Sequence, residues 1–295
     1  MRGKAGLLLV ISCLLIGTDC QQSSTVRPNP PSTRNPADAT PAWSPDGSMI
    51  AFGHYQQPGN DSMATGLYVL ELATHRRRFL ASGRIVGTSW FSDSKHIAFS
   101  IGPICTIGLT DSIPTQVVSG TNYYPCVSVG DTAIVFDTPT NDAYGESVIW
   151  VTNLVTQSTR DISVHLTGEW RHAQWSPDGR WIVHYRFGYS NNGTTELFKM
   201  DPNGQSPIRL TNDNVDDTDP CWDPTNKLIA WSRGAYFDRE IWVANTDGSN
   251  PHKVRRGVEP AFSPDGKRLV FVDPSSSDGI DLHIMNVDGT GYTPL

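Results

Sequence analysis

Residues 41–52 of the chain are PAWSPDGSMIAF, and residues 260–271 are PAFSPDGKRLVF. Four more segments align with this pair without gaps: residues 88–99 (TSWFSDSKHIAF), 125–136 (PCVSVGDTAIVF), 173–184 (AQWSPDGRWIVH) and 220–231 (PCWDPTNKLIAW). Equivalent positions in successive copies lie 37 to 48 residues apart. A repeat of about 44 residues is typical of a propeller blade with four strands. The copies therefore predict an all-β fold, a six-bladed β-propeller of four-stranded antiparallel blades over residues 41–295.

Each copy contains the elements of a β-hairpin. In Ser-Pro-Asp-Gly, proline presets the backbone for the second turn position, and glycine takes the left-handed conformation that follows. The turn joins a short strand, which ends in an aromatic residue in five copies, to a second apolar strand. A third apolar strand such as residues 67–72 (LYVLEL) and a short fourth strand complete the blade. The copies at residues 88–99 and 125–136 lack both the Pro and the Gly at the shared positions, so blades 2 and 3 should be the least regular.

Composition and charge exclude some classes of function. The formal net charge is −7 at pH 7, whereas a nucleic-acid-binding protein needs a basic face for phosphates. The tight basic run at residues 76–78 is best explained as part of a solvated loop. A domain of about 250 residues buries enough surface to fold without disulfides. Cys105 and Cys126, in neighbouring blades, could nevertheless pair if the protein is exported; otherwise they are small buried residues.

Residues 1–20 have the pattern of a secretory signal peptide. Arg2 and Lys4 form a positive start, and residues 7–16 are an apolar run. A helix needs about 20 apolar residues to span a bilayer, so this run is too short for a membrane helix but suits a signal peptide. The sequence therefore predicts an exported protein that is periplasmic or associated with the cell envelope.

Cys20 lies where bacterial lipoprotein signals place the cysteine that becomes lipid-modified. Asp19 and Gly17 depart from that pattern, and cleavage to a soluble secreted protein that loses Cys20 is the alternative. Residues 21–40 are rich in Ser, Thr, Pro and Asn and predict an extended tether. A lipid on Cys20 would be the protein's one contact with a membrane.

The WSPDG phrase, the Asp-x-x-Gly turn after the third strand and residues 209–222 (RLTNDNVDDTDPCW) resemble the TolB-like β-propellers, a branch of the WD-repeat-like propellers. The resemblance covers residues 41–295 and implies the propeller fold. TolB itself has a separate α/β domain before its propeller, whereas residues 21–40 here contain only the tether. A role in the Tol–Pal envelope system therefore does not transfer whole. The resemblance implies an envelope-associated binding protein, expected to be a monomer.

The face opposite the Ser-Pro-Asp-Gly turns should carry the longer and more varied loops. Loops held by a rigid scaffold are frequent binding sites, and exposed aromatic side chains dominate binding energetics. The aromatic residues expected in these loops include Tyr55, Phe187, Tyr189 and Tyr236. Each of them could instead pack beneath its own loop.

The repeat also predicts which residues surround the mouth of the central tunnel. The position three residues before the last residue of each first strand should reach the axis. The six residues at this position are Thr40, Gly87, Tyr124, His172, Asp219 and Glu259, with Arg171 beside them. A mouth of mixed charge suits recognition of a polar segment, such as a peptide or a glycan. A solvated rim without a ligand is the alternative.

Two features were weighed as metal sites. The acidic stretch at residues 213–219 could offer oxygen ligands to calcium, although it does not match an EF-hand loop. His172 and His184 should lie roughly opposite each other on adjacent strands, where two imidazoles could share a metal ion. No third histidine maps there, and a stacked or hydrogen-bonded structural pair is the simpler interpretation. We therefore expect no metal and no cofactor.

No catalytic motif is convincing. Residues 92–95 match S-x-x-K but occupy the hairpin turn instead of the start of a helix. The sequence therefore favours a noncatalytic module that binds a protein, peptide or glycan of the cell envelope. The alternative is a propeller enzyme of lyase or cyclase type that uses a metal or an acid/base pair at the tunnel mouth. His172, Asp219 and Glu259 would then be its catalytic residues.

Overall fold

The computed structural model describes residues 37–58, 61–140, 147–163, 169–187, 193–235, 238–275 and 281–295. The chain divides into two compact units, Met1–Pro31 and Ser32–Leu295, and all of the described residues belong to the second. The predicted signal peptide, Cys20 and most of the predicted tether lie outside the described residues. Within the described part, 23 strands are present, and no helix has the length and apolar character needed to cross a membrane.

Four sheets of the described part have four strands each, and neighbouring strands follow one another in the chain. All of their pairings are antiparallel. The first sheet comprises β1 (Asp38–Trp43), β2 (Met49–His54), β3 (Gly66–Glu71) and β4 (Arg76–Ser82). The others comprise β12 (Glu169–Trp175), β13 (Ile182–Phe187), β14 (Glu196–Met200) and β15 (Ile208–Arg209); β16 (Asp217–Trp222), β17 (Leu228–Arg233), β18 (Glu240–Asn245) and β19 (His252–Arg256); and β20 (Val258–Phe262), β21 (Arg268–Val272), β22 (Leu282–Asn286) and β23 (Thr293–Pro294).

The fifth sheet has seven strands and corresponds to the two copies that lack the shared proline and glycine of the turn. It comprises β5 (Thr88–Trp90), β6 (His96–Ser100), β7 (Gly102–Gly108), β8 (Thr115–Val127), β9 (Ala133–Pro139), β10 (Ser147–Asn153) and β11 (Thr159–Asp161). The long strand β8 pairs with β7 through its first residues and with β9 through its last. Because these two copies are the most closely spaced, one continuous strand replaces two strands and the loop expected between them.

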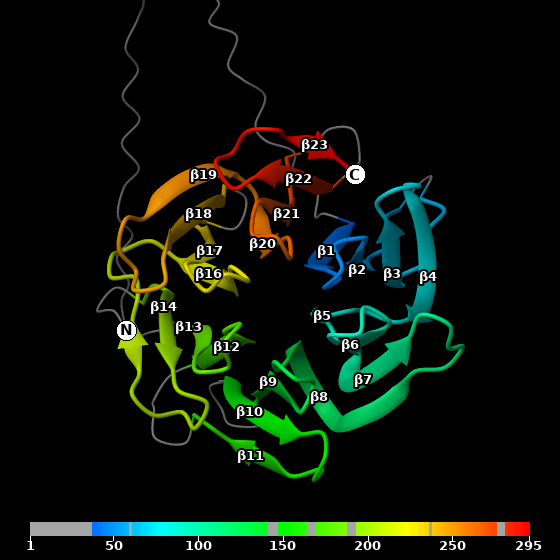
Figure 1. The fold of residues 1–295 in the computed structure, drawn as a ribbon, viewed down its shortest axis with the longest axis horizontal. Coiled ribbons are helices and arrows are strands. Elements are labelled where there is room, and N and C mark those ends of the chain that lie inside the picture. The colour runs from blue at the N-terminus through cyan, green and yellow to red at the C-terminus, as the bar shows by residue number, and fades with distance from the viewer. Residues whose placement is uncertain are drawn as a thin grey trace, which may run out of the picture. The chain divides into compact units, whose positions relative to one another are not determined.

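The sheets of the second unit lie side by side around a common centre, with the first strand of each hairpin innermost (Figure 1). Apolar side chains fill the wedges between sheets. In one wedge, Val69 of β3 and Ile97 of β6, both fully buried, belong to the same cluster. In another, Ile50 of β2 and Val270 of β21 pack together. The N-terminal and C-terminal sheets therefore meet and close the ring.

The predicted turn is present in the structure. At residues 44–47, the Gly47 N–H donates to the Ser44 carbonyl at 2.9 Å, and Gly47 has a φ of 73°. The Asp46 carboxylate accepts hydrogen bonds from the Ser44 hydroxyl at 2.6 Å and from the Ser48 N–H at 3.0 Å. The turns of neighbouring sheets are also connected to each other. The Asp46 N–H donates to the Ser94 hydroxyl, in the turn between β5 and β6, at 3.1 Å.

Candidate functional site

The six residues predicted to surround the axis share one backbone geometry. Their φ angles are all positive: 50° for Thr40, 97° for Gly87, 48° for Tyr124, 52° for His172, 52° for Asp219 and 53° for Glu259. Five of them lie at a β-bulge, where the first strand advances by one residue more than its partner. A non-glycine residue at positive φ costs on the order of 1–3 kcal/mol and is held by surrounding structure, often at functional sites. Side chains along a regular strand alternate between the two faces of the sheet, and the bulge interrupts this alternation at these residues.

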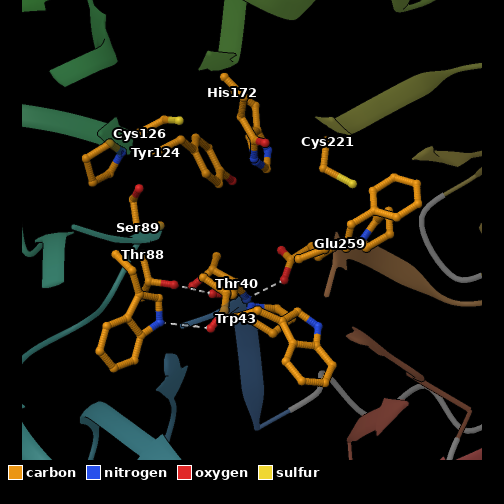
Figure 2. Close-up of a pocket in the computed structure, with 18 of the residues that line it drawn as sticks. Thr40, Trp43, Thr88, Ser89, Tyr124, Cys126, His172, Cys221 and Glu259 are labelled. Atoms are coloured by element: carbon orange, nitrogen blue, oxygen red, sulfur yellow. Dashed lines mark hydrogen bonds between the residues drawn. The ribbon is translucent and has the colours of Figure 1, made fainter. Parts of the chain in front are cut away.

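A cavity of about 240 Å³ lies on the axis (Figure 2). Five of the six bulge-level residues line it, Asp219 being the exception. Two residues further along each first strand, a second row of lining residues includes small side chains. That row is Ala42, Ser89, Cys126, Gln174, Cys221 and Ala261. The cavity thus has a polar, charged end and a narrower row of mostly small side chains behind it.

His172 is held from several sides. Its imidazole stacks on the Tyr124 ring, with ring centroids 4.2 Å apart and planes inclined by 12°. Its Nδ1 lies 3.3 Å from Oδ1 of Asp219, and its Nε2 lies 3.3 Å from Nε2 of Gln174. Its backbone N–H donates to Oδ1 of Asp137 at 3.0 Å. These contacts fix both the ring and the strained backbone of His172.

The two predicted carboxylates at the mouth have opposite electrostatic surroundings. Burial by itself would raise the pKa of Asp219, but the hydrogen bond and charge of His172 and the charge of Arg239 outweigh it and lower that pKa to about 2. The Nη1 atom of Arg239 lies 3.6 Å from Oδ2 of Asp219. Burial and the nearby charge of Asp219 raise the pKa of Glu259 to about 7. Asp219 is therefore ionised at neutral pH, whereas Glu259 exchanges a proton there.

Asp137 is a site residue that the sequence analysis missed. It is fully buried on β9, its Oδ2 has no partner, and burial raises its pKa to about 7. The equivalent position in the next sheet but one is Ser232, whose hydroxyl accepts the Glu259 N–H at 2.9 Å. A signal was present in the sequence: the position that directly follows the twelve-residue repeat is polar in three copies, as Ser100, Asp137 and Ser232.

Arg171 and the aromatic residues predicted in the loops differ in their surroundings. Arg171 forms an ion pair with Glu169 and does not line the cavity. The Tyr55 hydroxyl donates to the carbonyl of Ile85, which lies between β4 and β5, so this side chain contacts a different segment of the chain. Phe187, at the end of β13, is 49% exposed. The predicted residues Tyr189 and Tyr236 lie outside the described residues.

The acidic stretch at residues 213–219 is occupied by donors from the protein itself. Asp217 accepts from Trp231 Nε1 at 2.7 Å and lies 3.1 Å from Nη1 of Arg233. The same guanidinium lies 2.6 Å from Asp213, and Asp216 accepts the Thr195 N–H at 2.9 Å. Among the described residues, no group of three or more His, Cys, Asp or Glu side chains could hold a metal ion. The calcium hypothesis therefore lacks its free oxygen ligands.

His172 lies roughly opposite His184, as the repeat predicts, because residues 172 and 173 lie opposite His184 between the Arg171–Tyr185 and Gln174–Val183 pairs. The two imidazoles nevertheless have different neighbours. His184 is fully buried and lies against the Trp170 ring, with centroids 4.4 Å apart. Burial lowers the pKa of His184 to about 3, so its imidazole is neutral. The two histidines form neither a metal pair nor a structural pair.

The three described cysteines are free thiols, so Cys105 and Cys126 form no disulfide in this structure. Burial raises the pKa of Cys126 to about 11 and that of Cys221 to about 12. Both thiols therefore stay protonated at neutral pH. Nucleophilic cysteine chemistry needs the ionised thiolate, so neither thiol is activated for it.

A ring of antiparallel sheets whose innermost strands enclose an axial cavity defines a β-propeller. The chain belongs to the TolB β-propeller family, because the family model described as the TolB beta propeller domain matches residues 125–295.

Comparison with solved structures agrees with this fold. A putative TolB from Agrobacterium tumefaciens superposes with a TM-score of 0.66 at 19% identity, covering 78% of this chain and 87% of that one. An oligogalacturonate lyase in complex with manganese superposes with a TM-score of 0.57 at 16% identity, covering 86% and 75%. An uncharacterized peptidase, YuxL, from Bacillus subtilis (strain 168) is 30% identical over 82 residues, which are 24% of this chain and 12% of that protein's length. The similarity to the solved structures extends to the fold alone.

Proposed function

We propose that this protein is a noncatalytic binding propeller of the cell envelope that recognises a protein, peptide or glycan at the mouth of its axial cavity. The observation that carries the proposal is the ring of left-handed residues at the bulges. Four of the five strained non-glycine residues, Thr40, Tyr124, His172 and Glu259, line one small cavity with unlike side chains. Such strain persists only where surrounding structure enforces it, and it concentrates at ligand-binding sites. A purely structural tunnel would not need the strained backbone.

We also propose that the propeller has six blades and that the protein is exported. Counting β8 as the last strand of one blade and the first of the next divides the seven-stranded sheet into two blades, which makes six. Export rests on the pattern of residues 1–20, and membrane attachment rests on Cys20. Among the described residues, large exposed apolar side chains are distributed over several sheets: Phe79 lies on β4, Val155 lies between β10 and β11, and Phe187 lies at the end of β13. We therefore infer a monomer.

A second candidate is a propeller enzyme of lyase or cyclase type. It is favoured by the raised pKa values, each about 7, of Glu259 and Asp137 close to His172, because carboxyl groups with such values can exchange protons at neutral pH. One structurally similar protein is an oligogalacturonate lyase. The binding role remains the better proposal, because Asp137 is fully buried, which leaves Glu259 as the one carboxyl group beside His172 among the lining residues of the cavity.

Affinity capture from envelope extract tests the binding role. The bait is the full chain with a C-terminal tag, compared with a triple variant, His172→Ala, Asp219→Ala and Glu259→Ala. A control variant, His252→Ala, Glu71→Ala and Asp238→Ala, removes the same kinds of side chain outside the cavity. A partner lost only by the first variant supports the proposal. A partner that all three baits retain moves the binding site elsewhere, and failure to capture any partner contradicts the binding role.

A further inference from the structure

Glu259 is a carboxylate in the cavity without a cationic partner. Its Oε2 accepts the Thr40 N–H at 2.6 Å, and it forms no ion pair with any described residue. Asp219, by contrast, has an ion-pair partner in Arg239 at 3.6 Å and a hydrogen-bond partner in His172 at 3.3 Å. A carboxylate at a partly desolvated site is stabilised when a cation lies within about 4–6 Å of it. Glu259 therefore has no direct ion-pair partner among the described residues, although the charges of His172 and Arg239 act on it from a greater distance.

Other polar groups on the same wall are also unsatisfied. Figure 2 shows that Glu259, Tyr124 and Thr40 surround the cavity from different strands. The Tyr124 hydroxyl makes no hydrogen bond to any described residue, and the buried Thr40 Oγ1 has no partner. A buried polar atom without a partner is destabilising. An ionised carboxylate can only accept hydrogen bonds, whereas a hydroxyl can either donate or accept, so Glu259 makes this wall suited to a ligand that carries N–H donors and the two hydroxyls are compatible with it.

The geometry points to a primary ammonium group. We propose that the cavity binds the primary ammonium of a peptide, either a lysine side chain or an α-amino terminus, with Glu259 as its counter-ion. The inference rests on the binding role proposed above and names the chemical group that is recognised there.

Size and ligand geometry favour an ammonium over other cations. The cavity of about 240 Å³ is smaller than sites for drug-sized molecules, which are roughly 300–1,000 Å³, so it accommodates a side chain or a chain end. A guanidinium prefers both carboxylate oxygens in a bidentate pair, and one oxygen of Glu259 is already engaged by Thr40. An ammonium is a point charge that needs a single oxygen. A divalent metal is disfavoured because no group of three ligating side chains is present among the described residues.

Binding of an ammonium should be coupled to loss of a proton from Glu259. Burial and the charge of Asp219 raise the pKa of Glu259 to about 7, and a bound cation favours the ionised carboxylate. The other charged groups facing this part of the cavity are His172, Asp219 and Arg239. Between pH 6 and pH 8 the ionised fraction of Glu259 rises about tenfold, so affinity for a lysine ammonium should rise about tenfold. An α-amino group, with a pKa of about 7.7–8.0, loses its own charge over the upper part of this range.

Titration calorimetry on the full chain with EDTA present tests the inference. The probes are N-acetyl-Gly-Lys-Gly-amide, the same peptide with an acetylated lysine side chain, and Gly-Gly-Gly-amide with a free α-amino group, each up to about 50 mM so that millimolar dissociation constants are detected. We expect the lysine peptide or the α-amino peptide to bind, the acetylated peptide not to bind, and proton release at pH 7. The lysine peptide should bind about tenfold more tightly at pH 8 than at pH 6, whereas the α-amino peptide should gain less.

Two variants complete the test. Glu259→Gln retains an acceptor for the Thr40 N–H and should weaken binding at pH 8 by at least about tenfold while abolishing its pH dependence. The control Glu240→Gln, whose side chain pairs with Lys253 outside the cavity, should bind as the native protein does. Equal binding of the free and acetylated peptides, or no binding of either amine, overturns the ammonium inference. If a partner is still captured through the cavity in that case, the proposed binding role survives without it.

Discussion

The ring of Tyr124, on β8, stacks on the imidazole of His172, on β12, with centroids 4.2 Å apart. Both residues occupy the same position in their repeats, and both have the left-handed backbone of a bulge, with φ angles of 48° and 52°. The stack thus joins two neighbouring first strands directly at the cavity wall. It also holds the His172 imidazole where its Nδ1 can approach Asp219.

The stack should contribute measurably to stability. Aromatic pairs are worth about 0.5–1.5 kcal/mol beyond the area they bury. A double-mutant cycle with Tyr124→Leu and His172→Leu should therefore show a coupling energy of about that size in denaturant unfolding. Additive effects of the two substitutions would show that the stacked geometry contributes nothing.

Gly87 should not tolerate a side chain. A Cβ at this position would lie 2.5 Å from the Tyr124 Cα, and its φ is 97°. Gly87→Ala should lower the free energy of unfolding by more than about 2 kcal/mol, since both overpacking and backbone strain contribute. Gly179→Ala is the control, because Gly179 also has positive φ but has no atom within 4 Å of the added Cβ. Equal losses for the two variants would mean that the close approach to Tyr124 is unimportant.

His54 should make the stability of the protein fall at alkaline pH. Its Nδ1 lies 2.7 Å from Asp38 and its Nε2 lies 3.1 Å from Asp61, so both ring nitrogens must carry protons to donate. Burial opposes the charge, but the hydrogen bonds and charges of Asp38 and Asp61 raise the pKa of His54. The stabilisation is complete below the unfolded-state pKa of about 6.5 and is lost as pH rises through the raised folded-state pKa.

Imidazole chemical shifts followed by NMR, together with melting temperatures at several pH values, measure this effect. Asp61→Asn removes one of the two carboxylates, so it should lower the pKa of His54 and move the loss of stability to lower pH. An unchanged His54 titration in Asp61→Asn would contradict the proposed pairing.

Asp137→Asn should stabilise the protein at pH 8. Burial raises the pKa of Asp137 to about 7, above an unfolded-state value of about 3.9. Because the folded state binds this proton more tightly, stability falls as pH rises from about 4 to about 7, by up to about 4 kcal/mol. Asparagine is neutral at every pH, and its oxygen can still accept the His172 N–H.

Thermal unfolding of the native protein and of Asp137→Asn at pH 4.5 and pH 8 tests this prediction. The variant should melt at a higher temperature at pH 8, and the difference should shrink at pH 4.5. A variant that is less stable at pH 8 would show that the Asp137 carboxylate is ionised and well compensated in the folded protein.

The loop aromatics and the two histidines show where inference from the sequence ended. Tyr55 was expected to face solvent, but its hydroxyl has an acceptor in the Ile85 carbonyl of another segment. His172 and His184 lie opposite each other at the bulge, but their imidazoles contact different residues, Tyr124 and Trp170. Neither the distant acceptor nor the bulge can be recognised from one local pattern.

The sequence by itself determined the all-β fold, the hairpin turns and the six positions around the axis. It could do so because the same short-range geometry recurs in every copy, so one local pattern specifies its equivalents. Only the tertiary structure decided that β8 serves two neighbouring hairpins and that Asp137 holds the His172 backbone. It also decided that Asp219 has an ion-pair partner in Arg239, while Glu259 forms no ion pair with any described residue. Ionisation depends on charges and burial contributed by other blades, and those neighbours exist only once the ring has closed.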